Sequence, residues 1–331
     1  MVLDVVLFVF RVLVFPGFTF LFFFTMFCDW IERKIEARMQ NRMGPTFTGP
    51  AGILQPFADI VKLLTKEDIV PRGAKKTVFR LAPLISFSII IFALSFLPID
   101  GSAVIPNSSF SGDLIFIMAL ITLANFFLFL AGWASANPYG DIGAARVLTQ
   151  FLGYDIPLIL LALAPAFLAG SLTVSDIASN QYLPFIILAP WAFVLFVITL
   201  QAELEKDPFD IPHAESEVVG GLETEFCGGK LAFLRLTRDT QIVFGAALVV
   251  ELFLGGPYGP VFFGLPAFWY FLWFVLKLLG VVVITEYVTC LFARLRIDQV
   301  LTTNWKVILP LSVLSLTLTI AVATWIYPMV V

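Results

Sequence analysis

The chain has 331 residues, of which 60% are hydrophobic and only 13% charged, and its mean hydropathy is +0.96. These values exclude a water-soluble globular domain and are typical of a protein with several membrane spans. The net charge of −4 says little about partners, because most charges lie between the apolar segments.

Eight apolar segments approach or reach the roughly 20 residues that a helix needs to cross a bilayer. In chain order they are residues 5–28, 81–99, 114–133, 156–172, 183–201, 242–254, 261–285 and 307–327. The first segment lacks the basic leader and small-residue cleavage site of a signal peptide, so we expect it to remain in the protein. The predicted fold class is an all-α membrane protein, one polytopic domain over residues 1–331 with about eight transmembrane helices.

Lysine and arginine favour cytoplasmic loops, and here they are concentrated in alternate connections. The connections 29–80, 134–155, 202–241 and 286–306 hold 18 of the 20 basic residues, and Arg11 and Lys277 fall within spans. We therefore expect these four loops inside the cell, both termini outside, and the plasma membrane as the location.

The first basic loop contains a segment with helical spacing of apolar residues. Within residues 52–67, Ile53, Phe57, Ile60, Val61 and Leu64 fall on one side of a helix. This pattern predicts an amphipathic helix along the membrane surface or beneath a partner, and a helix that merely covers the bundle fits it equally.

The third basic loop is densely acidic. Eight of the 24 acidic residues lie between Glu203 and Glu225. The cysteines, Cys28, Cys227 and Cys290, form no CxxC motif, and His213 is the single histidine. We therefore expect neither a metal site nor another cofactor in this chain, because iron–sulfur clusters and haem need ligand sets that it lacks.

Five motifs lie in these loops: DWIERK at 29–34, NRMGP at 41–45, GPAGILQPFADIVKLLTKE at 49–67, DPFDIPHAESE at 207–217 and RLRIDQVLTTNWK at 294–306. Together they resemble the family of the H subunit of respiratory complex I (NADH:quinone oxidoreductase) and its counterparts in membrane-bound [NiFe] hydrogenases and related complexes. The resemblance covers nearly the whole chain.

The resemblance implies a coupling subunit between peripheral redox-arm subunits and antiporter-like membrane subunits. It implies iron–sulfur clusters in partner subunits, nickel–iron in the hydrogenase branch, and quinone in quinone-reducing members. Its acidic residues would link electron transfer to proton or sodium translocation. Membrane lipids are expected partners and nucleic acid is not.

Three segments depart from the quinone-reducing pattern. His213 replaces a glutamate, residues 226–228 read FCG in place of YSG, and residues 153–155 read GYD in place of SYE. The NPY sequence at 137–139 is similar to the hydrogenase branch. These differences favour a ferredoxin-linked hydrogenase or sulfur-reducing complex; a quinone-chamber subunit of NADH:quinone oxidoreductase is the alternative.

Several charged residues are candidates for a proton relay or for coupling. Clustered carboxylates raise one another's proton affinity in a partly dry site, and charges inside spans are functional candidates. The candidates are Glu215, Glu217, Glu223, Glu225, His213, Asp155, Arg146, Glu203, Glu251 and Lys277. The alternatives are a solvated acidic loop that binds a basic partner, a helix-terminal acid at Asp155, and a structural Glu251–Lys277 ion pair.

Arg33, Lys34, Arg38 and Arg42 form a basic run after the first span. Such a run is typical of contact with lipid headgroups, and contact with a soluble partner is the alternative. Two functions of other classes also stay open: an autonomous secondary transporter or channel, which would act alone, and a purely structural anchor.

Overall fold

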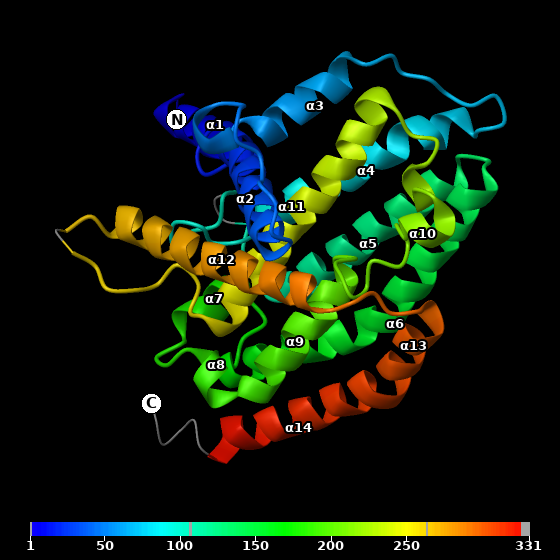
Figure 1. The fold of residues 1–331 in the computed structure, drawn as a ribbon. Helices are drawn as coiled ribbons and strands as arrows, with labels where there is room; N and C mark the ends of the chain where they lie inside the picture. The colour runs from blue at the N-terminus through cyan, green and yellow to red at the C-terminus, as the bar shows by residue number, and fades with distance from the viewer. Residues whose placement is uncertain (1, 106–107, 263, 326–331) are drawn as a thin grey trace.

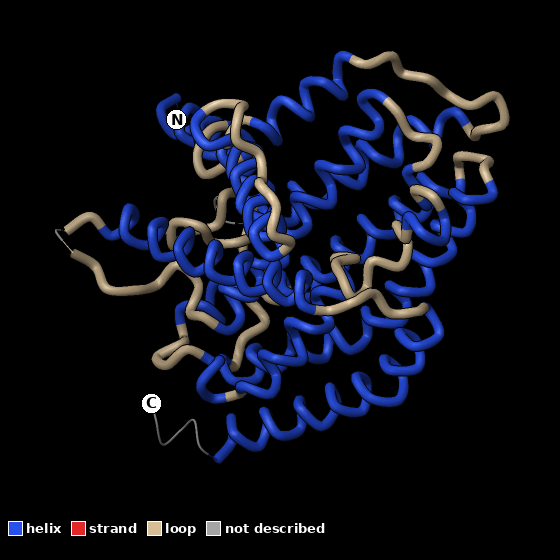
Figure 2. Tube along the Cα trace, viewed as in Figure 1, coloured by secondary structure: helices blue, strands red, loops and turns tan. Residues whose placement is uncertain are grey.

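The computed structural model describes residues 2–105, 108–262 and 264–325. Figure 2 shows helices joined by loops, and no strand is present within these residues. The predicted all-α class is therefore confirmed.

The described residues contain fourteen α-helices and three helical turns of the 3₁₀ or π type. The α-helices are α1 (Val2–Leu13), α2 (Phe18–Met39), α3 (Gln55–Thr65), α4 (Lys76–Leu94), α5 (Asp113–Trp133), α6 (Pro138–Ala169), α7 (Val174–Ser179), α8 (Phe185–Leu188), α9 (Pro190–Glu203), α10 (Glu215–Val218), α11 (Gly228–Phe253), α12 (Pro266–Leu291), α13 (Ile297–Thr303) and α14 (Leu309–Trp325). Pro50–Gly52 and Gly221–Glu223 are 3₁₀ turns, and Asn304–Ile308 is a π-helical turn between α13 and α14.

Six segments of the described chain are long and apolar enough to cross a membrane: Phe8–Met39, Lys76–Leu94, Asp113–Trp133, Pro138–Ala169, Pro266–Leu291 and Ile297–Trp325. The other two predicted spans correspond to α9, which has only 14 residues, and to α11, which is long but carries five charged residues. The eighth predicted span ends at residue 327, which lies outside the described residues.

Two predicted spans are interrupted in the structure. The predicted helix over 5–28 is divided between α1 and α2, because Pro16 cannot donate a backbone hydrogen bond and Gly17 approaches the Val12 carbonyl closely. A Cβ on Gly17 would lie 1.9 Å from that oxygen. Likewise, Pro190 separates α8 from α9 within the predicted span 183–201.

The four predicted cytoplasmic loops are shorter than expected. Residues 29–39, 138–155, 228–241 and 286–291 are helical. Charged side chains do not interrupt a helix. The helices α2, α6, α11 and α12 therefore continue beyond their apolar segments into residues that were predicted to lie in loops. The basic run therefore begins on α2 and not in a loop.

The predicted amphipathic helix is confirmed as α3. Pro56, Ile60 and Leu63 are buried against the chain, whereas Phe57 and Leu64 are exposed. The exposed apolar side chains make α3 suited to a membrane surface or a partner, as predicted.

The connections rich in basic residues gather at one end of the bundle, near α10 and α13, whereas α7 and α8 lie at the other (Figure 1). The Lys75 backbone N–H donates to the Ala134 carbonyl at 3.0 Å, and the Leu295 N–H donates to the Pro208 carbonyl at 3.0 Å. The Ile69 N–H also donates to the Cys227 sulfur at 3.3 Å, which joins the first connection to the third. The four basic connections are thus linked in one layer, which positions the candidate site.

Candidate functional site

A cavity of about 640 Å³ lies among α2, α3, α11, α12 and the connection 204–227. Most of the residues that line it are charged or titratable: Asp29, Glu32, Arg33, Glu36, Asp59, Glu205, Lys206, Asp207, Asp210, His213, Glu223, Arg235, Arg238, Asp239 and Glu286. We call it the charged cavity. Its lining suits proton and charge exchange.

Lys206 lies between two carboxylates at the inner wall of the charged cavity. Its Nζ is 2.9 Å from a Glu286 oxygen and 3.1 Å from a Glu32 oxygen. All three side chains are largely buried, and they come from α2, α12 and the connection after α9. This cluster holds together three segments that are distant in the sequence.

The two carboxylates also determine the proton affinity of the lysine. Burial alone lowers the pKa of Lys206, but the adjacent charges of Glu32 and Glu286 outweigh burial and raise that pKa. Lys206 therefore stays protonated at neutral pH and is the positive group between the two acids.

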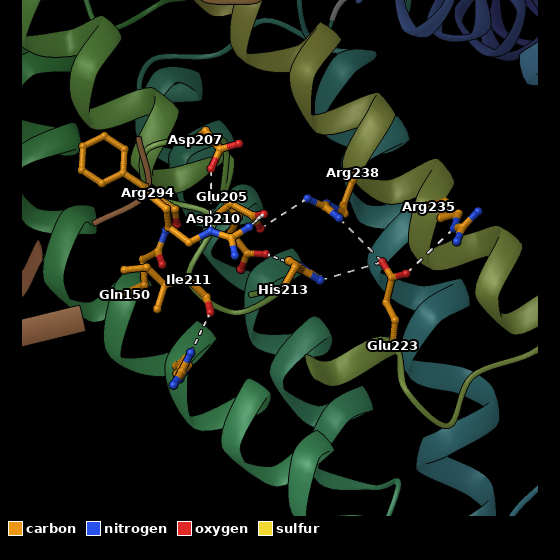
Figure 3. Close-up of polar contacts among 12 residues, drawn as sticks. Gln150, Glu205, Asp207, Asp210, Ile211, His213, Glu223, Arg235, Arg238 and Arg294 are labelled. Atoms are coloured by element: carbon orange, nitrogen blue, oxygen red, sulfur yellow. Dashed lines mark hydrogen bonds and ion pairs between the residues drawn. The ribbon is translucent and has the colours of Figure 1, made fainter. Parts of the chain in front are cut away.

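His213 joins two acids on another wall of the cavity. Figure 3 shows it between Glu205 and Glu223, with its Nε2 2.8 Å from a Glu205 oxygen and its Nδ1 4.0 Å from a Glu223 oxygen. A neutral imidazole both donates and accepts a proton through its two nitrogens. His213 is therefore hydrogen-bonded to Glu205, whereas the 4.0 Å separation from Glu223 is an ion-pair distance that is too long for a hydrogen bond.

Arginines surround the acids of this wall (Figure 3). Arg294 donates to Asp210 at 2.6 Å, and Arg238 of α11 lies 3.8 Å from both Asp210 and Glu223. Burial raises the pKa of Asp210, although the charges of Arg238, His213 and Arg294 oppose this effect. Burial likewise raises the pKa of Asp207.

At the rim, Arg33 connects α2 to α3. Its guanidinium contacts Asp29 at 2.8 Å and Asp59 at 2.7 Å. The sequence predicts contact of Arg33 with lipid or a partner. In the structure its guanidinium binds Asp29 and Asp59 of the same chain.

A polar chain continues from the cavity into the apolar core. Glu203, at the end of α9, is 2% exposed and accepts a hydrogen bond from Asn125 of α5 at 2.7 Å. Asn125 in turn accepts from Gln241 of α11 at 2.7 Å. The charges of Glu205, which lines the cavity, and of Asp155 both act on Glu203.

Asp155 does not begin a span as predicted but lies within α6, so it is not a helix-terminal acid. Its carboxylate accepts a hydrogen bond from Thr122 at 2.8 Å.

Arg146, one of the predicted coupling residues, lies on the same helix. It binds Glu217 at 2.6 Å and the Ile211 carbonyl at 3.2 Å.

Glu217 and Glu225 are not among the residues that line the charged cavity. Glu217 is half-exposed in its pair with Arg146, and Glu225 accepts a hydrogen bond from Asn137. Glu215 begins α10, but its side chain lies outside the part of the chain that the structure describes. Their role in a relay stays a prediction.

The other members of the basic run lie near the end of α2. Lys34 lies 6.0 Å from the Trp30 ring centre, Arg38 is in the last turn, and Arg42 pairs with Glu36 at 3.0 Å. Their contact with lipid or a partner stays a prediction.

Glu251 and Lys277 do not form the ion pair considered from the sequence. The Lys277 Nζ donates to the carbonyls of Leu254, Gly256 and Tyr258 at 2.7, 2.9 and 2.8 Å. Glu251 is fully buried, and neither of its carboxylate oxygens has a hydrogen-bond partner among the described residues.

The sequence did not indicate that Glu32, Lys206 and Glu286 form one cluster. Glu32 lies in the DWIERK motif and Glu286 at the predicted end of a span, so their charges at the membrane boundary were visible signals. Their convergence on Lys206 was not visible.

The family model described as NADH dehydrogenase matches residues 12–320. The H subunit of NADH-quinone oxidoreductase from Dehalococcoides mccartyi (strain CBDB1) is 38% identical over 88% of this chain and 80% of its own length. The corresponding H subunits of Geobacillus kaustophilus and Thermomicrobium roseum are 38% and 36% identical, over 89% and 90% of this chain and 88% and 91% of their own lengths.

These similarities cover most of both chains and confirm the resemblance that the loop motifs carry. The structure adds several apolar membrane-crossing helices and a charged cavity beside them. The chain therefore belongs to the NADH dehydrogenase family that includes the H subunits of NADH-quinone oxidoreductases, and is a membrane subunit of a complex I-like complex.

Proposed function

We propose that this chain couples electron transfer in a peripheral redox arm to ion translocation by neighbouring membrane subunits. The charged cavity receives a change in charge or protonation, and Glu203 passes it into the membrane interior. The observation that carries this proposal is the position of Glu203, which is buried and yet adjacent to both the cavity wall and Asp155.

The contacts support a path with defined steps. Glu205 and His213 are hydrogen-bonded at the cavity wall, and Glu203 is two residues from Glu205 but turned towards the core, where Asn125 holds it. A buried carboxyl without an adjacent counter-charge has a raised proton affinity, because its charged form is costly, and can therefore accept a proton from a more exposed carboxyl.

The ionic lining favours a ferredoxin-linked hydrogenase or sulfur-reducing complex, because a quinone needs an apolar wall for its tail. Quinone reduction is the second candidate. Its support is the name of the relatives, which are H subunits of NADH-quinone oxidoreductases, and a cavity of about 640 Å³, large enough for a small organic molecule.

The proposal extends to partners and location. The layer of basic connections would face the cytoplasm at the plasma membrane, with both termini outside, and would bind the redox-arm subunits. Iron–sulfur clusters, and nickel–iron in a hydrogenase, would be held by those subunits. Antiporter-like subunits would contact the helices within the membrane.

Glu203→Gln tests the coupling role. We expect the complex to assemble and transfer electrons, while ion translocation per electron falls by about tenfold or more, as for the loss of other acid–base groups. Glu36→Gln is the matched control, because Glu36 lines the same cavity but pairs with Arg42 at the exposed rim. Unchanged translocation in Glu203→Gln would contradict the path.

Glu203→Gln also separates coupling from a structural anchor, because for an anchor the substitution should alter assembly alone. An autonomous transporter should instead move its solute when this chain is reconstituted alone.

Glu215→Gln is a second test of the path. It is expected to abolish translocation with assembly intact, and retained translocation would remove Glu215 from the path.

Purification of the native complex through a tag on this chain identifies the branch. Nickel with a hydrogenase-like large subunit and no quinone would establish the hydrogenase branch. A large subunit with clusters but neither nickel nor quinone would indicate sulfur reduction, and bound quinone with quinone-dependent oxidation would establish the second candidate.

A further inference from the structure

A second buried ionisable group, the Glu251 carboxyl, lies at the end of α11 opposite the charged cavity. Glu251 lies 12 residues beyond Asp239, which is about 18 Å along a helix. It is fully buried, and both carboxylate oxygens lack a hydrogen-bond partner in the described chain. An ionised carboxylate in such a position costs several kcal/mol or more, so the neutral carboxyl is the form that fits.

The neighbouring lysine cannot neutralise Glu251 in the observed arrangement. An ammonium group has three N–H donors, and those of Lys277 bind the carbonyls of Leu254, Gly256 and Tyr258. We call these three carbonyls the carbonyl collar. Pairing Lys277 with Glu251 would leave at least one collar carbonyl without its donor.

Gly256 connects the collar to the carboxyl group. Its carbonyl accepts from Lys277, its φ is +50°, and a Cβ at this position would lie 2.4 Å from the Glu251 Oε2. The carboxyl group therefore packs against the backbone that holds the ammonium, and a movement of the lysine side chain out of the collar would bring the ammonium towards the carboxyl group.

We propose that Glu251 is a proton-binding site and that Lys277 is its movable counter-charge. In the observed state Glu251 carries a proton and the Lys277 ammonium lies in the carbonyl collar. When the ammonium moves to Glu251, the O–H bond breaks, the carboxylate pairs with the ammonium, and one proton leaves to water on that side of the bundle.

The surroundings contain few other groups that could take this role. The charge that acts on Glu251 is that of Lys277 of α12. Tyr258, in the loop before α12, is acted on in turn by Glu251, by Tyr270 of α12 and by Asp176 of α7. Asp176 accepts a hydrogen bond from Ser171 at 3.0 Å, and Gln181 donates to the backbone carbonyl of Glu251 at 2.9 Å, not to its carboxyl group.

Infrared spectroscopy of the purified complex tests the proposal without depending on coupling activity. At neutral pH, Glu251→Gln should remove a C=O stretching band of a protonated carboxyl group that shifts in D₂O. Asp59→Asn is the control, because the ion pairs of Asp59 with Arg33 and Lys62 lower the pKa of its carboxyl group and favour the ionised form. It should remove no such band.

Two further variants keep the test decisive. Glu251→Asp should move the band and not abolish it, which covers the case in which Glu251→Gln does not assemble. Lys277→Met should keep the band to higher pH than the parent complex, because no counter-charge stabilises the carboxylate. Absence of the band in the parent complex, or loss of the band at the same pH in Lys277→Met, would overturn the proposal.

Discussion

Two sites along α11 and α12, the cluster around Lys206 and the site of Glu251 and Lys277, use the same residue types in opposite arrangements. In the charged cavity, Lys206 contacts two carboxylates, and its side chain contributes no hydrogen bond to the surrounding backbone among the described contacts. At the far end, Lys277 contacts three backbone carbonyls, while the Glu251 carboxyl has no hydrogen-bond partner among the described residues. A partly buried lysine next to a glutamate therefore need not form an ion pair with it.

The arrangements differ in the cost of changing charge. Removing one member of a paired buried cluster leaves uncompensated charge, which is strongly destabilising. The neutral Glu251 carboxyl group and the Lys277 ammonium do not bind each other in the observed arrangement, so a change in one has less effect on the other. We therefore expect the charged cavity to be the more sensitive region.

Lys206→Met is expected to have the largest effect. It leaves Glu32 and Glu286 facing each other without a counter-charge, at a cost of about 3 to 5 kcal/mol. The thermal unfolding midpoint of this chain in the purified complex should fall accordingly. Arg42→Met is the control, because its exposed pair with Glu36 should contribute no more than about 1 kcal/mol. Equal effects would show that Lys206 is not the centre of the cluster.

Lys277→Met is expected to have a smaller effect. The three collar carbonyls lose their donor, which costs about 1.5 to 3 kcal/mol, but no carboxylate is left unpaired. The same thermal measurement applies. A loss as large as that of Lys206→Met would mean that Glu251 is ionised and depends on the lysine.

The fold class, the amphipathic helix α3 and the gathering of basic connections could be predicted because each depends on local composition or spacing. Helix ends were predicted less well. Charges at the ends of α2 and α11 suggested loops, but a helix continues through charged residues when they face a polar cavity or water.

The cluster around Lys206 could not be derived from one sequence. Its bond to Glu286 joins residues 80 positions apart, and sequence spacing gives no information on such contacts. The considered Glu251–Lys277 pair was wrong for a related reason, because the loop after α11 folds back and supplies carbonyls that compete with the carboxylate. Side-chain composition does not reveal backbone ligands.

Asp59→Asn tests the exposed rim of the cavity. Burial alone raises the pKa of Asp59, but its bonds and charge interactions with Arg33 and Lys62 outweigh burial and lower that pKa. The pair therefore stabilises the fold above the unfolded-state value of about pH 4, and this contribution is lost as the pH falls through the folded value. We expect a loss of about 0.2 to 1 kcal/mol at neutral pH. The midpoints of variant and parent should converge in acid; a constant difference would exclude the ion pair as the cause.

Glu251→Gln is expected to have the smallest effect, less than about 1 kcal/mol, because an amide replaces a neutral carboxyl group that has no hydrogen bond to lose among the described residues. Glu286→Gln is the counterpart in the charged cavity and should cost more than about 1.5 kcal/mol, because it removes one of the two carboxylates that hold Lys206. Thermal midpoints of the two variants in the same preparation measure the difference directly. If both variants were destabilised equally, Glu251 would be charged in the folded protein, and the two ends of the bundle would follow the same rule.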